Sequence, residues 1–346
     1  MRYSEEKQYA LELINEHRAR KGLPTMILGD NVSAQIHAEL SLQDCHSSPW
    51  STDGLNPVAR YTLVGGYQDS HMVVSGVDYC GDREEREFIT NQKIRDVIDS
   101  LLNPEWGDYF GEQILASFEN RHYSKLNVGL VRDSHDTTAV FLLEKDYIEF
   151  EELPVFEEGL LTLSGRVKNG ATLEDPEDLN MALEYHQPPR PLTAGQLARV
   201  YSSTLGIRVA NIRRPAGEGR YWPNDEITKM YYRCITPYHE SLIGAPPVES
   251  RAQASELHNY AKEECRKIQE DKVGGEERTV PWITASQWNV ANGNFTVTAD
   301  LSEVLHNHGN GIYTLFIWGI VDEESVLISG YAIFHGIPRP TGYSPP

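Results

Sequence analysis

The pattern of apolar residues changes midway along the chain, and this change limits the architectures open to it. Apolar residues at helical spacing predict one helix ended by Gly22-Leu-Pro24, a second after Asp30, and two more over Glu84–Leu102 and Phe110–Phe118. The stretch from His46 to Gly81 has no clear period and is expected to be a long loop with short strands.

Paired strands follow the helices, and the second half of the chain is rich in strand-like runs. The first pair is Leu126–Val131 and Ala139–Phe150. The later runs are Leu160–Val167, Met181–Tyr185, Ile207–Ile212, Phe295–Ala299, Ile312–Val321 and Val326–Phe334. Gly and Pro separate these runs. In Phe295–Ala299, apolar and Thr side chains alternate, which is typical of a half-buried strand.

This order of elements predicts an α+β protein of two domains. Because 346 residues exceed one ordinary domain, we expect one domain over residues 1–153 and a second over 154–346. The first is predicted to be an α-β-α sandwich. The second is predicted to be an antiparallel β-sandwich with a helix inserted near residues 252–272.

Charge excludes some classes of partner. The chain has 31 Lys and Arg against 51 Asp and Glu, a formal net charge of −20. Like-charge repulsion disfavours nucleic acids and anionic membrane surfaces as partners. The longest uncharged apolar run, Gly311–Val321, is too short for a bilayer helix, so no membrane span is expected.

The four cysteines leave the cellular compartment open. Cys45 and Cys80 lie in the first half and Cys234 and Cys265 in the second, and none has Cys-x-x-Cys spacing. One disulfide in each domain fits an oxidising compartment, and four buried free thiols are the equal alternative. The first residues show no secretory leader, which fits either a cytoplasmic protein or an extracellular one whose leader was removed.

Several segments of the first half are similar to those of one known family. They are Leu13-Ile-Asn-Glu-His-Arg-Ala-Arg-Lys-Gly-Leu-Pro24, Asp53-Gly-Leu-Asn-Pro57, Arg60-Tyr-Thr-Leu-Val-Gly-Gly-Tyr67, Asn127-Val-Gly-Leu130 and the strand through Ala139–Phe150. Their order and spacing resemble a prokaryotic-type CAP domain, the superfamily of cysteine-rich secretory, antigen-five and pathogenesis-related proteins. Pro188-Pro-Arg-Pro-Leu-Thr-Ala-Gly-Gln-Leu-Ala-Arg199 resembles part of a β-domain that follows some microbial CAP domains.

The resemblance implies an α-β-α sandwich with a cleft in which two His and two acidic residues hold a divalent cation such as zinc or calcium. This chain departs from that donor set. Pro49, Met72 and Trp106 stand where the resemblance implies His, Glu and His. Because Pro, Met and Trp do not supply the imidazole and carboxylate donors of such a site, the chain is predicted to have lost it.

Neighbouring residues provide an alternative set of ligands. His46, His71 and Glu105 each lie within three positions of a lost donor, and a shifted register would gather them in one cleft. That set would support a metal-dependent hydrolase. A second pair, His306 and His308, would share one side of a strand, but its surroundings favour a polar turn.

The sequence therefore favours an extracellular or cell-surface binding or scaffold protein over an enzyme. The expected binding cleft lies near Pro49, Trp50, Met72 and Trp106, and its partner would be an apolar or amphipathic ligand, a protein or a glycan. The aromatic residues of the second half suggest a glycan-binding surface as a further alternative, although aromatic side chains also fill sandwich cores. Adjacent carboxylates such as Glu151-Glu152 are interpreted as solvated surface charges.

Overall fold

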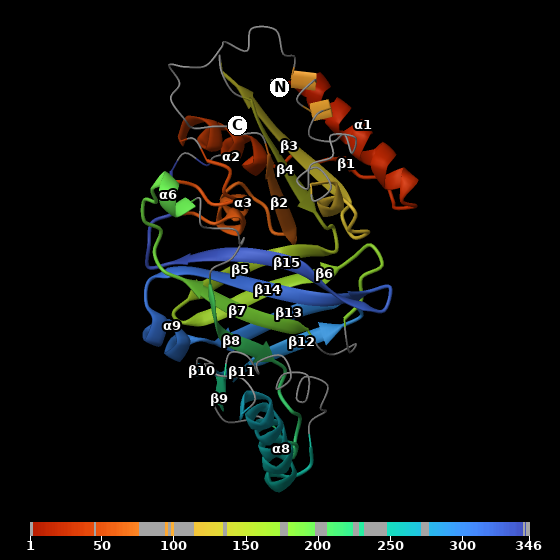
Figure 1. The fold of residues 1–346 in the computed structure, drawn as a ribbon. Helices are drawn as coiled ribbons and strands as arrows, with labels where there is room; N and C mark the ends of the chain where they lie inside the picture. The colour runs from red at the N-terminus through yellow and green to blue at the C-terminus, as the bar shows by residue number, and fades with distance from the viewer. Residues whose placement is uncertain are drawn as a thin grey trace.

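The structure is a computed structural model, and Figure 1 shows its arrangement. It describes residues 3–44, 46–75, 94–95, 98–99, 114–133, 137–173, 179–197, 206–223, 228–231, 248–270, 277–341 and 343. Helices and antiparallel or mixed sheets are both present, so the protein belongs to the mixed α+β class. A helix-and-sheet unit lies above two packed sheets in Figure 1, and the helix α8 lies at the opposite end.

The first unit is a four-stranded sheet with helices on both faces. Its elements are α1 Ser4–Arg20, β1 Ile27–Leu28, α2 Ser33–Asp44, α3 Pro57–Leu63, β2 Ser70–Ser75, β3 Lys125–Arg132 and β4 Thr137–Glu144. The sheet order is β1-β3-β4-β2, and only β1 and β3 pair in parallel.

Alternation along β4 determines which helix packs on which face. Phe141 and Leu143 pack with Ile14 of α1, whereas Val140 and Leu142 pack with Ala38 of α2. Successive side chains of a strand point to opposite faces, so both faces of β4 are covered and all eight of its residues are buried.

One prediction for this unit was wrong. The segment expected to be a loop contains a helix, α3, as well as the strand β2. The side chain of Asn56 caps α3 by accepting a hydrogen bond of 2.7 Å from the backbone N–H of Ala59, and Pro57 occupies the first turn. Asn at the N-cap followed by Pro is a start signal for a helix, and α3 is too short to show a helical period.

The second unit consists mainly of two sheets packed face to face. Its elements are β5 Ile148–Glu157, β6 Leu160–Val167, β7 Asn180–His186, α6 Ala194–Leu197, β8 Ile207–Arg213, β9 Thr228–Tyr231, α8 Arg251–Glu270, β10 Glu277–Val280, β11 Trp282–Thr284, β12 Gln287–Ala291, β13 Asn294–Asp300, α9 Ser302–His308, β14 Gly311–Val321 and β15 Glu324–His335. A five-stranded sheet has the order β11-β8-β7-β14-β15, and a four-stranded sheet has the order β12-β13-β6-β5.

The core of the second unit lies between these sheets. Leu163 and Phe295 come from the four-stranded sheet, Leu183 and Leu315 come from the five-stranded sheet, and all four pack in one buried cluster. The ring of Phe156 meets that of Tyr313 edge to face across the same core. The alternation expected in β13 is confirmed, because its buried and less buried residues alternate.

Strand β5 belongs to the second unit from its first residue. Its register runs from Ile148 opposite Val167 to Glu157 opposite Leu160, so the position between residues 153 and 154 falls inside a paired strand. Helix α8 lies where a helix was expected near 252–272. Within the described residues, no helix combines the length and apolar character that a membrane span requires.

The two units share a packed and hydrogen-bonded interface. Val58 of α3 packs with Ile312 and Ala332 of the five-stranded sheet. The backbone N–H of Ala332 donates a 3.0 Å hydrogen bond to the hydroxyl of Thr62, and Ser329 donates one of 2.6 Å to the carbonyl of Tyr67. The helix that the sequence did not predict is therefore the main contact of the first unit with the second.

Candidate functional sites

A fully buried arginine lies where the sequence predicted a cleft. Arg60 of α3 is 0% exposed, and its guanidinium donates hydrogen bonds to the carbonyl oxygens of Pro49 at 2.5 Å and Leu55 at 2.9 Å. It also donates to the hydroxyl of Ser51 at 2.6 Å and lies 3.8 Å from the sulfur of Met72. The structure thus brings Pro49 and Met72 to one place, and the guanidinium of Arg60 fills the space between them.

A carboxylate that interacts with this guanidinium is held in the same loop. The carboxylate of Asp53 accepts hydrogen bonds from the Ser51 hydroxyl at 2.5 Å, from the Leu55 N–H at 2.9 Å and from the hydroxyl of Tyr343. Burial lowers the pKa of Arg60 to about 10, and the Asp53 carboxylate opposes that shift. Even with this pKa, Arg60 is a cation at neutral pH.

Two buried histidines stand beside Arg60. The ring centroids of His37, in α2, and His46 are 5.7 Å apart. The Nε2 of His37 donates to the carbonyl of Ser48 at 2.9 Å, and among the described residues its Nδ1 has no hydrogen-bond partner. Burial first, and then the charge of Arg60, lower the pKa of both histidines, so both are neutral at pH 7.

The proposed metal ligands do not all meet. His71 of β2 stacks on Tyr123, which belongs to the apolar cluster on the α1 face of the sheet. The adjacent Met72 packs on the α2 face, where Arg60 lies. His46 and His71 are therefore on opposite faces of the sheet. Glu105 and Trp106 lie outside the described residues.

The donor set around Arg60 does not fit a divalent cation. A carbonyl oxygen and a thioether flank the guanidinium, and a second cation there would be repelled by its charge. Among the described residues, no three His, Cys, Asp or Glu side chains are grouped so that they could hold a metal ion.

Trp50 lines a different space, between the two units. A cavity of about 350 Å³ is bounded by residues of both units. Its lining is Trp50, Gly54, Asn56, Tyr185, His186, Gln187, Pro188, Pro189, Arg190, Leu192, Ile207 and Ile312. The indole of Trp50 and the imidazole of His186 lie 6.4 Å apart between ring centroids, so the cavity joins an aromatic group of each unit.

Burial and backbone contacts fix the walls of this interdomain cavity. Burial lowers the pKa of His186 to about 4, and among the described residues its Nε2 has no hydrogen-bond partner. The N–H of Leu192 donates to the carbonyl of Thr52 at 2.8 Å. Gly54 has a φ of 82°, and a Cβ there would lie 2.2 Å from the carbonyl oxygen of Arg190, so only glycine permits this close approach.

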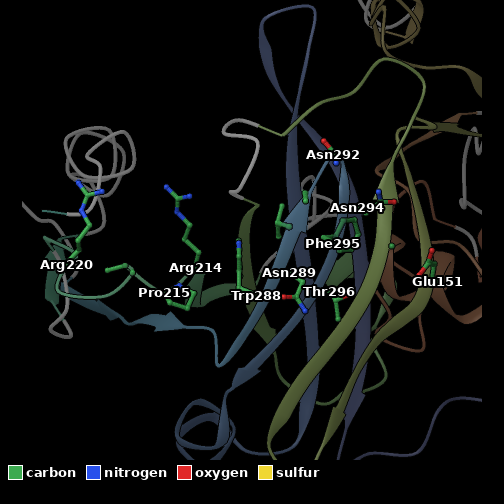
Figure 2. A pocket seen from close by; sticks show the side chains of 15 residues that line it. Glu151, Arg214, Pro215, Arg220, Trp288, Asn289, Asn292, Asn294, Phe295 and Thr296 are labelled. Atoms are coloured by element: carbon green, nitrogen blue, oxygen red, sulfur yellow. The ribbon is translucent and has the colours of Figure 1, made fainter.

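A larger cavity, of about 990 Å³, follows the edge strand β12 of the second unit, and Figure 2 shows it. Its lining is Glu151, Gly165, Arg214, Pro215, Ala216, Gly217, Arg220, Trp288, Asn289, Val290, Ala291, Asn292, Asn294, Phe295 and Thr296. We call this cavity the β12 groove. It combines one indole and two guanidinium groups with amide and hydroxyl side chains, which suits the binding of a polar ligand.

The remaining residues that the sequence singled out lie outside the sites around Arg60 and Trp50, or outside the described residues. Cys45, Cys80 and Cys234 lie outside the described residues, and Cys265 falls in α8 where its side chain is not described. His306 and His308 occupy the last turn of α9 rather than a strand. Glu151 and Glu152 are exposed in β5.

Sequence reasoning missed His37, His186 and the role of Arg60. Arg60 begins one of the segments that resemble the CAP family, but it was given no function because the residues around it in the sequence do not indicate that its side chain is buried. His37 lies nine positions before His46 in a predicted helix, and a pairing of the two could be proposed only once the end of that helix was known.

No known family model matches the chain, and no curated protein is similar to it.

Proposed function

We propose that the protein is a non-catalytic binding protein that acts outside the cell or at its surface. Its first unit would be a CAP-like scaffold in which the side chain of Arg60 takes the place of a bound metal ion. The position of helices on both faces of the first sheet supports the CAP-like assignment. The contacts of Arg60 with Pro49 and Met72, two of the residues that replace expected donors, support the loss of the ion.

The interdomain cavity is the binding site in this proposal. The observation that carries it is the cavity of about 350 Å³ lined by Trp50 of one unit and His186 of the other. Its volume falls in the roughly 300–1,000 Å³ range of small-molecule sites. The walls are mostly aromatic and aliphatic, with the exposed cation Arg190 at one side. This chemistry suits a small amphipathic molecule with an apolar ring and a carboxylate.

The alternative of a metal-dependent hydrolase is less well supported. It requires His46 and His71 in one cleft, and the sheet separates them. The glycan-binding alternative concerns a different site, the β12 groove.

The test is a ligand-observed NMR screen of the full chain with small aromatic carboxylic acids and their neutral amides. We expect an acid to bind, and Trp50→Leu to weaken that binding at least about tenfold. The matched control is Trp288→Leu, which also removes one indole but leaves the interdomain cavity intact. Equal binding by Trp50→Leu and the unchanged protein, or no binding by any acid, would overturn the proposal.

A further inference from the structure

We propose that the β12 groove is a second binding site and that it takes an acidic polysaccharide, one that carries carboxylate or sulfate groups. This site is independent of the interdomain cavity, since the two share no lining residue.

One wall is a short loop that follows β8 and presents two arginines. Gly217 and Gly219 have φ values of 89° and 70°, and the N–H of Arg220 donates to the carbonyl of Gly217 at 3.3 Å, so the loop turns tightly. The indole N–H of the buried Trp222 donates to the carbonyl of Arg214 at 2.8 Å. This hydrogen bond holds the loop in place, and a loop that is already ordered loses less entropy when a ligand binds.

The other wall is the edge of the four-stranded sheet. Asn289 of β12 lies opposite Thr296 of β13, and Ala291 lies opposite Asn294, so these side chains share one face. Asn292 follows in the turn, and Asn289, Asn292 and Asn294 are all exposed. Amide groups both donate and accept hydrogen bonds, so a row of them suits the hydroxyl groups of a sugar chain.

One aromatic side chain of the lining belongs to the edge strand itself. Trp288 is half-buried in β12, next to Asn289. In Figure 2, Arg220, Arg214 and Trp288 extend in the same direction, with Asn292 and Asn294 beyond them and Glu151 at the far end. The indole packs partly against the core of the second unit and also lines the groove, so the remaining part of its surface can contact a sugar ring.

Local charge selects an acidic ligand. The whole chain carries −20, yet the lining of the β12 groove has two arginines and one acidic residue, Glu151. Glu218 lies in the same loop but is not part of the lining. Guanidinium groups bind carboxylates and sulfates through paired, charge-assisted hydrogen bonds. The acidic surface elsewhere on the protein would repel an anionic polymer, whereas the two arginines of the β12 groove would attract it.

The experiment measures binding of the full chain by affinity electrophoresis in gels that contain polygalacturonate, dextran sulfate or uncharged dextran. We expect retardation by one or both acidic polymers and none by dextran, and the two acidic gels distinguish a uronate ligand from a sulfated one. The double variant Arg214→Gln/Arg220→Gln should bind the retained polymer at least about tenfold more weakly. Trp288→Phe should weaken binding less, because it keeps an aromatic ring.

The matched control is Arg20→Gln, which removes an exposed arginine in the last turn of α1, outside both the β12 groove and the interdomain cavity. It should leave polysaccharide binding unchanged, so a loss in this variant would show only a general charge effect and would overturn the proposal. Retardation by dextran as strong as by the acidic polymers would also overturn it. So would equal binding of single-stranded DNA, since that result would assign the arginines to any polyanion.

Discussion

The fully buried guanidinium of Arg60 donates a 2.5 Å hydrogen bond to the backbone carbonyl of Pro49, a residue that is partly buried. This bond ties α3 to the loop that follows α2. The same guanidinium is bonded to Leu55 and Ser51, so one buried side chain organises the whole segment between the two helices. The consequences for stability are large enough to measure.

Replacing Arg60 with Met should strongly destabilise the protein. The change preserves apolar bulk but removes the guanidinium donor from the carbonyls of Pro49 and Leu55, and it removes the cation that interacts with the Asp53 carboxylate. Breaking a buried charged network of this kind typically costs about 3–5 kcal/mol. Urea unfolding followed by circular dichroism measures the free energy of unfolding.

The control for Arg60→Met is Arg121→Gln. Arg121 forms an exposed ion pair with Asp322, and such pairs contribute about 0–1 kcal/mol. If both variants lost the same small amount of stability, the buried network around Arg60 would not hold the loop as described.

Acid should destabilise the protein through His37 and His46. Their folded-state pKa values lie below the ordinary value of 6.5, so below that pH the unfolded chain binds more protons than the folded one. Stability is therefore present in full above about pH 6.5 and is lost as the pH falls further. The His186 pKa of about 4 acts in the same direction.

The variant His46→Leu isolates this effect. Glu144 acts in the opposite direction, because burial raises its pKa to about 7 and its folded form gains protons between that pH and its ordinary value of 4.5. Since the variant retains Glu144 and His186, their contributions cancel in the comparison. We expect His46→Leu to lose less stability than the unchanged protein between about pH 7 and pH 5 by urea unfolding. Identical losses would show that His46 is not held neutral.

The cap of α3 should be separable from the buried charge. Asn56→Ala removes the acceptor for the Ala59 N–H and should cost about 0.5–2 kcal/mol. Asn56→Ser supplies a hydroxyl acceptor and should recover most of that loss. Guanidinium chloride unfolding of the three proteins provides the comparison, and a stable Asn56→Ala would mean that Pro57 alone starts the helix.

The interface between the units should depend on one hydroxyl group. Thr62→Val keeps the shape of the side chain but leaves the buried N–H of Ala332 without its acceptor, a loss of about 1–3 kcal/mol. Thr62→Ser keeps the hydroxyl and should be the milder change. Differential scanning calorimetry measures both, and Thr62→Val should lower the melting temperature more than Thr62→Ser. The reverse order would place the stability of the interface in apolar packing alone.

Much of the fold could be predicted because its elements are long or strictly periodic. The runs Leu160–Val167 and Ile312–Val321 have continuous or alternating apolar character, and both are strands close to the expected bounds. Helix α3 could not be found by periodicity because it has seven residues, although the Asn56-Pro57 start signal was readable.

The candidate sites were harder to predict because they depend on contacts distant in sequence. Trp50 meets His186 across 136 positions, and no local pattern connects them. His46 and His71 looked equivalent in sequence, but alternation in β2 directs His71 to the face opposite Met72. The positions of His46 and His71 on opposite faces of the sheet therefore become clear only when the direction of each side chain along β2 is known.

Zinc titration followed by NMR of the histidine side chains tests most directly whether Arg60 stands in place of a metal ion. The imidazole signals of His37 and His46 report on the region beside Arg60. We expect both signals to remain unchanged as zinc is added to the full chain. A saturable shift of the His46 signal at one zinc per chain would contradict the account.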